Sequence, residues 1–272
     1  MSTESRNPRS YGLDKMSAQE IVRLMNEEEM IVQQALRSAE ADLAVTAERC
    51  AQAFVNGGRV FYVGSGTSGR IAQMDAAEMP PTFGIEPDRF IAVVSGGAKA
   101  EVKAVEDAED DEHAAVDALN KAAIGRNDVV IGLTASGKTP FAVAAVRHAR
   151  QKGVWTCGIA NNRNTPIIKA ADLGVVLDTG PEVLTGSTRL KAGTAQKLAL
   201  NRISTAAMVL AGKVVENLMV DVKAKNHKLK ERCVRIVREL TPATADEALE
   251  QLERHNWNIR EVIHVLSRTP VS

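Results

Sequence analysis

The chain has 272 residues, of which 44% are hydrophobic and only 3% aromatic, and its 34 Lys and Arg residues balance 34 Asp and Glu residues. That length suits one large domain or one domain with a small appendage, with a core built mainly from Ala, Val, Leu and Ile. A neutral charge and few aromatic residues argue against nucleic-acid binding. Cys50, Cys157 and Cys233 are widely spaced and predict neither a disulfide framework nor a zinc site. The first residues are polar and no apolar run reaches the ~18 residues of a membrane span, so we expect a cytoplasmic protein.

The chain before residue 57 predicts an extended arm followed by two helices. Residues 1–15 are polar and contain Pro8 and Gly12, which disfavour regular structure. Ser17 precedes Glu20 by three residues, which is the spacing of a capping box at the start of a helix. A second helix is expected over about residues 29–54, and Gly57-Gly58 ends it.

The pattern of apolar residues changes after residue 58. Five short runs are continuously apolar: Val60–Val63, Phe90–Val94, Val129–Leu133, Trp155–Ala160 and Leu173–Leu177. Continuous apolar runs are typical of strands that are buried on both faces, and helical segments separate them here. We therefore expect a doubly wound α/β domain of three layers (αβα), in which a five-stranded parallel sheet is the middle layer. Ligands of such sheets bind beyond the carboxyl ends of the strands.

The chain after the fifth strand is predicted to be mostly helical. A loop over residues 179–189 precedes a long helix over residues 190–210, and after Gly212 a further helical stretch is expected to about residue 226. Three short helices follow, over residues 229–239, 243–254 and 258–267. The chain is thus predicted to divide into an N-terminal arm with helices (1–57), a sheet domain (58–226) and a small C-terminal helical bundle (227–272).

Two loops rich in glycine and hydroxyl groups follow the first and third strands. Their candidate ligand-binding residues are Ser65, Gly66, Thr67 and Ser68 in the first loop and Ser136, Lys138 and Thr139 in the second. Such hydroxyl groups, beside the free N–H groups of a helix N-terminus, suit an anion, most often phosphate. Each loop alone is equally well explained as a capped glycine-rich turn. Together they predict that one phosphate-bearing ligand bridges both loops.

The second loop also matches a nucleotide-binding pattern. Residues 132–139 fit the P-loop sequence G-x-x-x-x-G-K-[ST] between a predicted strand and a predicted helix. Asp178, at the end of the last apolar run, is available as a Mg²⁺-binding carboxylate. A P-loop NTPase is therefore one alternative, although it gives no role to the first loop or to the acidic residues.

Acidic residues stand out in two places. Glu78 lies just before Pro80-Pro81, which are expected to end the helix that follows the first loop. The helix dipole disfavours a negative charge at that end, so Glu78 is a candidate general acid or, more simply, a solvated helix end. The acidic run over residues 106–112 follows the second strand, and its spacing does not decide which member reaches a ligand. The five histidines show no metal-ligand spacing.

Taken together, these segments resemble the N-acetylmuramic acid 6-phosphate etherase family. The matching segments are residues 3–7, 25–26, 64–70, 75–84, 108–110, 135–140, 180–197 and 217–222. They occur in order and with the family's spacings, which is far more specific than any one motif. The resemblance implies a SIS (sugar isomerase) domain that acts as a homodimer on a phosphosugar, without metal or organic cofactor. The C-terminal bundle also resembles a three-helix unit of the ubiquitin-associated type.

The resemblance implies cleavage of the D-lactyl ether of N-acetylmuramic acid 6-phosphate, giving N-acetylglucosamine 6-phosphate and D-lactate in bacterial cell-wall recycling. It makes Glu78 the acid that assists the departure of lactate, and Glu109 the other essential carboxylate and the base at C2. The 6-phosphate is expected against the two hydroxyl loops. Further candidate substrate contacts are Glu182, Lys191 and Asn226, with structural loop contacts as the alternative.

The chain departs from the family's usual residues at a few positions. Ser65 replaces Ala, Ala77 and Met79 replace Ser and Cys around Glu78, and Lys138 replaces Arg, which creates the P-loop match. Lys keeps the charge but loses the bidentate geometry of Arg. SIS domains also act as sugar-phosphate sensors, and the glucokinase regulatory protein resembles this family. A non-catalytic sugar-phosphate-binding regulator is therefore the main alternative to an etherase.

Overall fold

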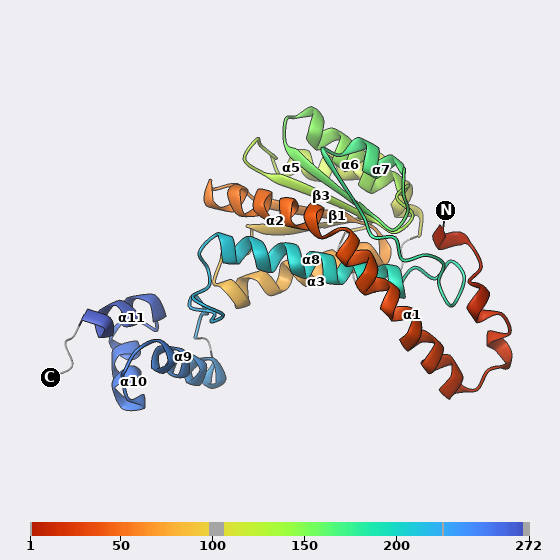
Figure 1. Ribbon diagram of the computed structural model, residues 1–272. Helices are drawn as coiled ribbons and strands as arrows, with labels where there is room; N and C mark the ends of the chain where they lie inside the picture. The colour runs from red at the N-terminus through yellow and green to blue at the C-terminus, as the bar shows by residue number, and fades with distance from the viewer. Residues whose placement is uncertain (1, 98–105, 225, 269–272) are drawn as a thin grey trace. The chain divides into compact units, whose positions relative to one another are not determined.

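A computed structural model describes residues 2–97, 106–224 and 226–268 of the chain (Figure 1). It divides into two compact units, Met1–Ala76 with Asp88–Ala207 and Ala77–Pro87 with Met208–Ser272. The first unit contains the sheet, and the second contains the C-terminal helices. None of the helices in the described part of the chain combines the length and the apolar character needed to span a membrane.

The first unit is built on a five-stranded parallel sheet with the order β2-β1-β3-β4-β5. The strands are β1 (Val60–Gly64), β2 (Phe90–Val94), β3 (Val129–Thr134), β4 (Trp155–Ala160) and β5 (Leu173–Val176). Gly64 of β1 is paired with Leu133 of β3, so these neighbouring strands end together at one edge of the sheet. The predicted α/β fold with five parallel strands is confirmed.

Helices cover both faces of the sheet and complete three layers (Figure 1). One face carries α5 (Glu112–Lys121), α6 (Pro140–Gln151) and α7 (Pro166–Ala170), and the other carries α2 (Glu40–Val55), α3 (Gly66–Phe83) and α8 (Lys191–Leu210). Phe61 of β1 packs in one core with Phe141 of α6. Its neighbour Tyr62 has the opposite orientation, and its hydroxyl group donates a hydrogen bond to Asp75 of α3 (3.1 Å). Continuous apolar strands are therefore needed to fill both cores.

The N-terminal segment forms three short 3₁₀ helices before the first long helix. These are η1 (Ser2–Glu4), η2 (Pro8–Ser10) and η3 (Leu13–Lys15), followed by α1 (Ala18–Ser38). The predicted capping box is present, because Glu20 N–H donates to Ser17 Oγ (3.3 Å) and Ser17 N–H donates to Glu20 Oε2 (2.7 Å). The predicted start of a second helix near residue 29 is wrong: α1 continues to Ser38 and the break falls at Ala39. Residues 27–30 are good helix formers, so nothing interrupts the helix there.

The second unit contains three helices around a small core. They are α9 (His227–Leu240), α10 (Ala245–Arg254) and α11 (Ile259–Arg268), as the sequence predicts to within a few residues. The predicted helical stretch between Gly212 and residue 226 is wrong, because the described residues 211–224 contain no helix. Val220 and Val222 are buried in the core of this unit. The backbone here consists of turns and irregular segments, with Val220 itself in a turn. The domain boundaries stay a prediction.

Candidate active site

A cavity of about 440 Å³ lies at the edge of the sheet where β1 and β3 end. The residues that line it are Glu4, Ser65, Gly66, Thr67, Ser68, Glu109, Thr134, Ala135, Ser136, Lys138, Thr139, Pro140 and Thr188. Both hydroxyl loops are therefore parts of one wall, and all the candidate phosphate-binding residues meet in one place.

Glycine residues allow the first turn of α3 to pack directly against the strands. A methyl group added at Gly69 would lie 2.7 Å from Val94 Cγ1 and 2.8 Å from Gly64 O. Gly66 has a φ of 55°, in the left-handed region that glycine adopts most readily. The N-terminus of α3 is thus open to the cavity and free of bulky side chains.

Hydroxyl groups and backbone N–H groups converge on the cavity. Thr134 Oγ1 lies 3.2 Å from Ser136 Oγ and 2.8 Å from Thr139 Oγ1. Ser65 Oγ is buried and has no hydrogen-bond partner among the described residues. A buried hydroxyl group without a protein partner beside a cavity is available to a ligand or a water molecule in that cavity. Since α3 and α6 both begin here, their free N–H groups favour an anionic ligand.

The acidic run contributes one carboxylate to this wall. Glu109 lies in η4 (Glu106–Asp110) and lines the cavity. Asp111 has a structural role instead, because its carboxylate accepts a hydrogen bond from Ala114 N–H (2.9 Å) and caps α5. Lys138, on the second loop, has an exposed side chain and lines the same cavity. The cavity therefore combines phosphate-type donors with a carboxylate.

Glu78 is not among the residues that line the cavity. The prediction that Pro80-Pro81 end the helix is wrong, because α3 continues through both prolines to Phe83. The helix ends at Gly84, which has a φ of 64° and whose N–H donates to Pro80 O (2.9 Å). Glu78 follows Gly66 by twelve positions on this helix, which corresponds to about 18 Å along the axis. Its side chain is exposed in the single chain.

The three other candidate contacts have structural partners away from the cavity. Glu182 is fully buried and accepts hydrogen bonds from the N–H groups of Lys191 (3.1 Å) and Ala192 (2.9 Å) at the start of α8; burial raises its pKa. The Lys191 ammonium group is buried in an ion pair with Glu28. Asn226 Oδ1 accepts a hydrogen bond from Leu229 N–H (2.9 Å) and caps α9. Their roles as substrate contacts stay a prediction.

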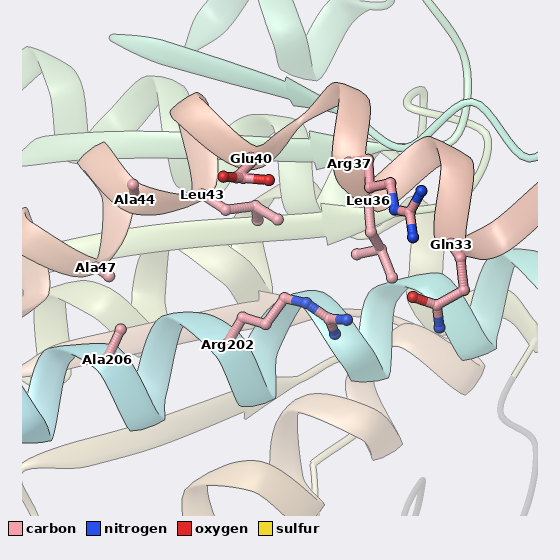
Figure 2. A pocket seen from close by; sticks show the side chains of 9 residues that line it. All are labelled: Gln33, Leu36, Arg37, Glu40, Leu43, Ala44, Ala47, Arg202 and Ala206. Carbon is pink, nitrogen blue, oxygen red and sulfur yellow. The ribbon is translucent and has the colours of Figure 1, made fainter.

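Figure 2 shows a second cavity, of about 360 Å³, between α1, α2 and α8. Leu36 and Leu43 are buried in its apolar floor, and Arg37 and Arg202 lie at its edge. It contains none of the predicted catalytic or phosphate-binding residues. The cavity at the ends of β1 and β3 is therefore the candidate active site.

Proteins that match nearly the whole chain share one enzyme name. An N-acetylmuramic acid 6-phosphate etherase from Geobacillus thermodenitrificans is 48% identical over 268 residues, which cover 98% of this chain and 91% of that protein. A protein of the same name from Bacillus subtilis is 43% identical and covers 98% of this chain and 88% of its own length. The chain belongs to the N-acetylmuramic acid 6-phosphate etherase family. The family resemblance seen in the sequence is confirmed.

This member of the etherase family also has the expected SIS fold. Residues 104–205 match the SIS domain, and residues 42–150 match the N-terminal SIS domain of the glucokinase regulatory protein. A solved phosphoheptose isomerase from Neisseria gonorrhoeae has a TM-score of 0.54 and 21% identity, and the similarity covers 70% of this chain and 99% of that one. At this identity the similarity concerns the fold alone.

The P-loop match fits the etherase structure poorly. Gly132, the first glycine of the pattern, lies inside β3 and is paired with Gly158 of β4, so it does not open a loop. A methyl group added at Gly132 would lie 2.5 Å from Val146 Cγ2, which shows that this glycine permits close helix packing. Asp178 forms an ion pair with Arg163 (3.0 Å). These residues therefore have structural explanations that need no nucleotide.

Sequence reasoning left out Thr134, Ala135 and Pro140, which flank the candidates of the second loop, and it missed Glu4 and Thr188 altogether. Both belong to segments without regular helix or strand patterns, and only the tertiary structure brings them to the two loops. For Glu4 the one signal was the family resemblance of residues 3–7 in an otherwise irregular arm.

Proposed function

We propose that this protein cleaves the D-lactyl ether of N-acetylmuramic acid 6-phosphate to N-acetylglucosamine 6-phosphate and D-lactate, a step of peptidoglycan recycling. The observation that carries this proposal is a cavity that combines hydroxyl and N–H donors suited to a phosphate with the Glu109 carboxylate. The relatives of this chain are named for the same activity. At about 440 Å³, the cavity is in the size range of small-molecule sites.

The chemistry begins with the open-chain sugar, because an ether is a poor electrophile. The C1 aldehyde acidifies the proton at C2, and the lactyl ether lies at C3. A base removes the C2 proton while an acid protonates the ether oxygen, so that the C3–O bond breaks and lactate leaves. Water then adds to the unsaturated aldehyde, with its hydroxyl group at C3 and its proton at C2. Such a sequence requires two carboxyl groups in opposite protonation states.

In this proposal Glu109 is the base at C2 and Glu78 is the acid that assists lactate departure. The 6-phosphate binds against Ser65, Thr67, Ser68, Ser136 and Thr139, at the N-termini of α3 and α6, with Lys138 beside it. Binding the phosphate away from the reacting bonds holds C2 and C3 in place for proton transfer.

We further propose that the protein is a cytoplasmic homodimer that needs no metal or organic cofactor. The three cysteines support a reducing compartment, because all are buried free thiols. The family resemblance supports the dimer.

The test is incubation with N-acetylmuramic acid 6-phosphate in the presence of a chelator, with an assay for D-lactate. Wild-type protein is expected to release D-lactate. Glu78→Gln and Glu109→Gln are each expected to lower turnover by about 10²–10⁴-fold, the usual contribution of a general acid or base, with little change in phosphosugar affinity. Binding without turnover by well-folded wild-type protein would support the regulator instead. Full activity of Glu109→Gln would show that another member of the acidic run is the base.

A further inference from the structure

The N-terminal arm brings a carboxylate to the cavity. Glu4, the last residue of η1, lines it together with the hydroxyl loops and Glu109. No hydrogen bond or ion pair joins the Glu4 carboxylate to any residue that the structure describes. This carboxylate is therefore available to a ligand.

The arm is fastened to the cavity immediately before Glu4. Thr3 is fully buried, and its Oγ1 accepts a hydrogen bond from Asn162 Nδ2 (2.8 Å). The same Nδ2 group donates to the carbonyl oxygen of Ala135 (3.0 Å), which lies in the second hydroxyl loop. Thr3 N–H also donates to Asn162 Oδ1 (3.3 Å). Asn162 thus ties the residue next to Glu4 to the wall of the cavity.

A second anchor follows Glu4. Asn7 is buried, and its Nδ2 donates to Glu28 Oε2 (2.8 Å) and to Pro181 O (3.3 Å). Burial acts to raise the pKa of Glu28, but the ion pair with Lys191 and the bond from Asn7 outweigh it and lower that pKa. The anchor is therefore charged and fully partnered. Two such anchors hold the arm on both sides of Glu4, as the positioning of a binding residue requires.

The chemistry of the cavity decides which part of a phosphosugar Glu4 contacts. An ionised carboxylate only accepts hydrogen bonds and repels a phosphate dianion. Glu4 Oε2 lies beside Gly186, where an added methyl group would be 3.6 Å away, in the same loop as Thr188. The donors that suit the phosphate come from the two hydroxyl loops, so Glu4 faces the rest of the ligand.

We propose that Glu4 accepts hydrogen bonds from the hydroxyl groups of the sugar chain and so positions the substrate between the two hydroxyl loops and Glu109. The inference rests on the proposed function, because it takes the ligand to be a phosphosugar. Glu4 transfers no proton in this proposal. It determines specificity by distinguishing a sugar phosphate from phosphate alone.

Calorimetric titration of the full chain with N-acetylglucosamine 6-phosphate and with inorganic phosphate tests the proposal. Glu4→Ala is expected to lower the affinity for the sugar phosphate by about tenfold, which is the scale of one hydrogen bond to a charged group. The affinity for inorganic phosphate is expected to stay the same or to rise. Glu4→Gln keeps an acceptor oxygen and is expected to recover part of the loss. Asp14→Ala removes an exposed carboxylate from the same arm, outside this cavity, and is expected to change neither affinity.

An equal loss of affinity for both ligands in Glu4→Ala would overturn the proposal, since it would indicate damage to the whole cavity. An unchanged affinity for the sugar phosphate in both Glu4 variants would overturn it as well. In the D-lactate assay, Glu4→Ala is expected to raise KM far more than it lowers kcat. If the wild-type protein binds the sugar phosphate but releases no lactate, the etherase activity fails while the titrations still decide the role of Glu4.

Discussion

At the scale of single residues, the cavity is lined by groups that can donate hydrogen bonds to an anion. Most of them are hydroxyl and backbone N–H groups, and Lys138 adds a positive charge. The backbone N–H of Lys138 donates to Ser136 Oγ (3.2 Å), and the N–H of Gly137 donates to Thr134 Oγ1 (3.3 Å). These bonds hold the loop in shape without the Lys138 side chain. We therefore expect the side chain at this position to tolerate replacement by another cation.

Lys138→Arg is therefore expected to keep turnover within about threefold of the wild type, because Arg retains the charge and adds donors. Lys138→Met is expected to raise KM by about tenfold, with the loss of a charged contact to the 6-phosphate. Steady-state kinetics at low and high salt measure both effects. Mg²⁺-dependent nucleotide hydrolysis by the wild type that is lost in Lys138→Arg would instead favour the NTPase.

At the scale of elements, one buried acid, Asp75, joins α3 to neighbouring elements of the sheet unit. Asp75 accepts hydrogen bonds from Tyr62 of β1 (3.1 Å) and from Asn201 (2.7 Å) and Ser204 (3.2 Å) of α8. Burial raises the pKa of Asp75, although these three bonds act in the opposite direction. The network holds the helix that begins at the cavity, so the position of Gly66 depends on it.

Asp75→Asn is expected to change how stability depends on pH. The folded-state pKa of Asp75 lies above its ordinary value of 3.8, so the folded protein binds the proton more tightly than the unfolded chain. Its contribution is fully present below pH 3.8 and is lost as pH rises through the folded-state pKa. The free energy of unfolding of the wild type is therefore expected to fall, relative to Asp75→Asn, as pH rises above 3.8 and through that folded-state pKa.

Urea unfolding followed by the fluorescence of Trp155, in a Trp257→Phe background, measures this difference within the sheet unit. Identical pH profiles for the two proteins would show that Asp75 does not titrate with a raised pKa.

At the scale of the whole molecule, the two proposed catalytic carboxylates belong to different units. Glu109 lines the cavity in the first unit, and Glu78 belongs to the second. Glu78 is not among the residues that line the cavity. In the proposed homodimer, we expect a second chain to bring its own Glu78 to the cavity.

Light scattering is expected to give twice the 29.2 kDa mass of the chain. Glu78→Gln and Glu109→Gln chains, each nearly inactive alone, are expected to recover about a quarter of wild-type activity when they are co-expressed, because half of the dimers then contain one intact site. Tagged heterodimers purified without any recovered activity would show that each site takes both carboxylates from one chain.

The sequence by itself determined the layers of the fold, the five strands and the family. Buried parallel strands need continuous apolar runs, and the family's motifs span almost the whole chain. It also placed the two hydroxyl loops together, since parallel strands end at a common edge. The family resemblance named Glu109, and the structure finds it in the cavity lining. Only the tertiary structure decided that Glu4 lines the cavity and that Lys191 pairs with Glu28. The physical reason is that local patterns report burial and backbone shape, whereas the partner of a charged side chain depends on segments far away in the sequence.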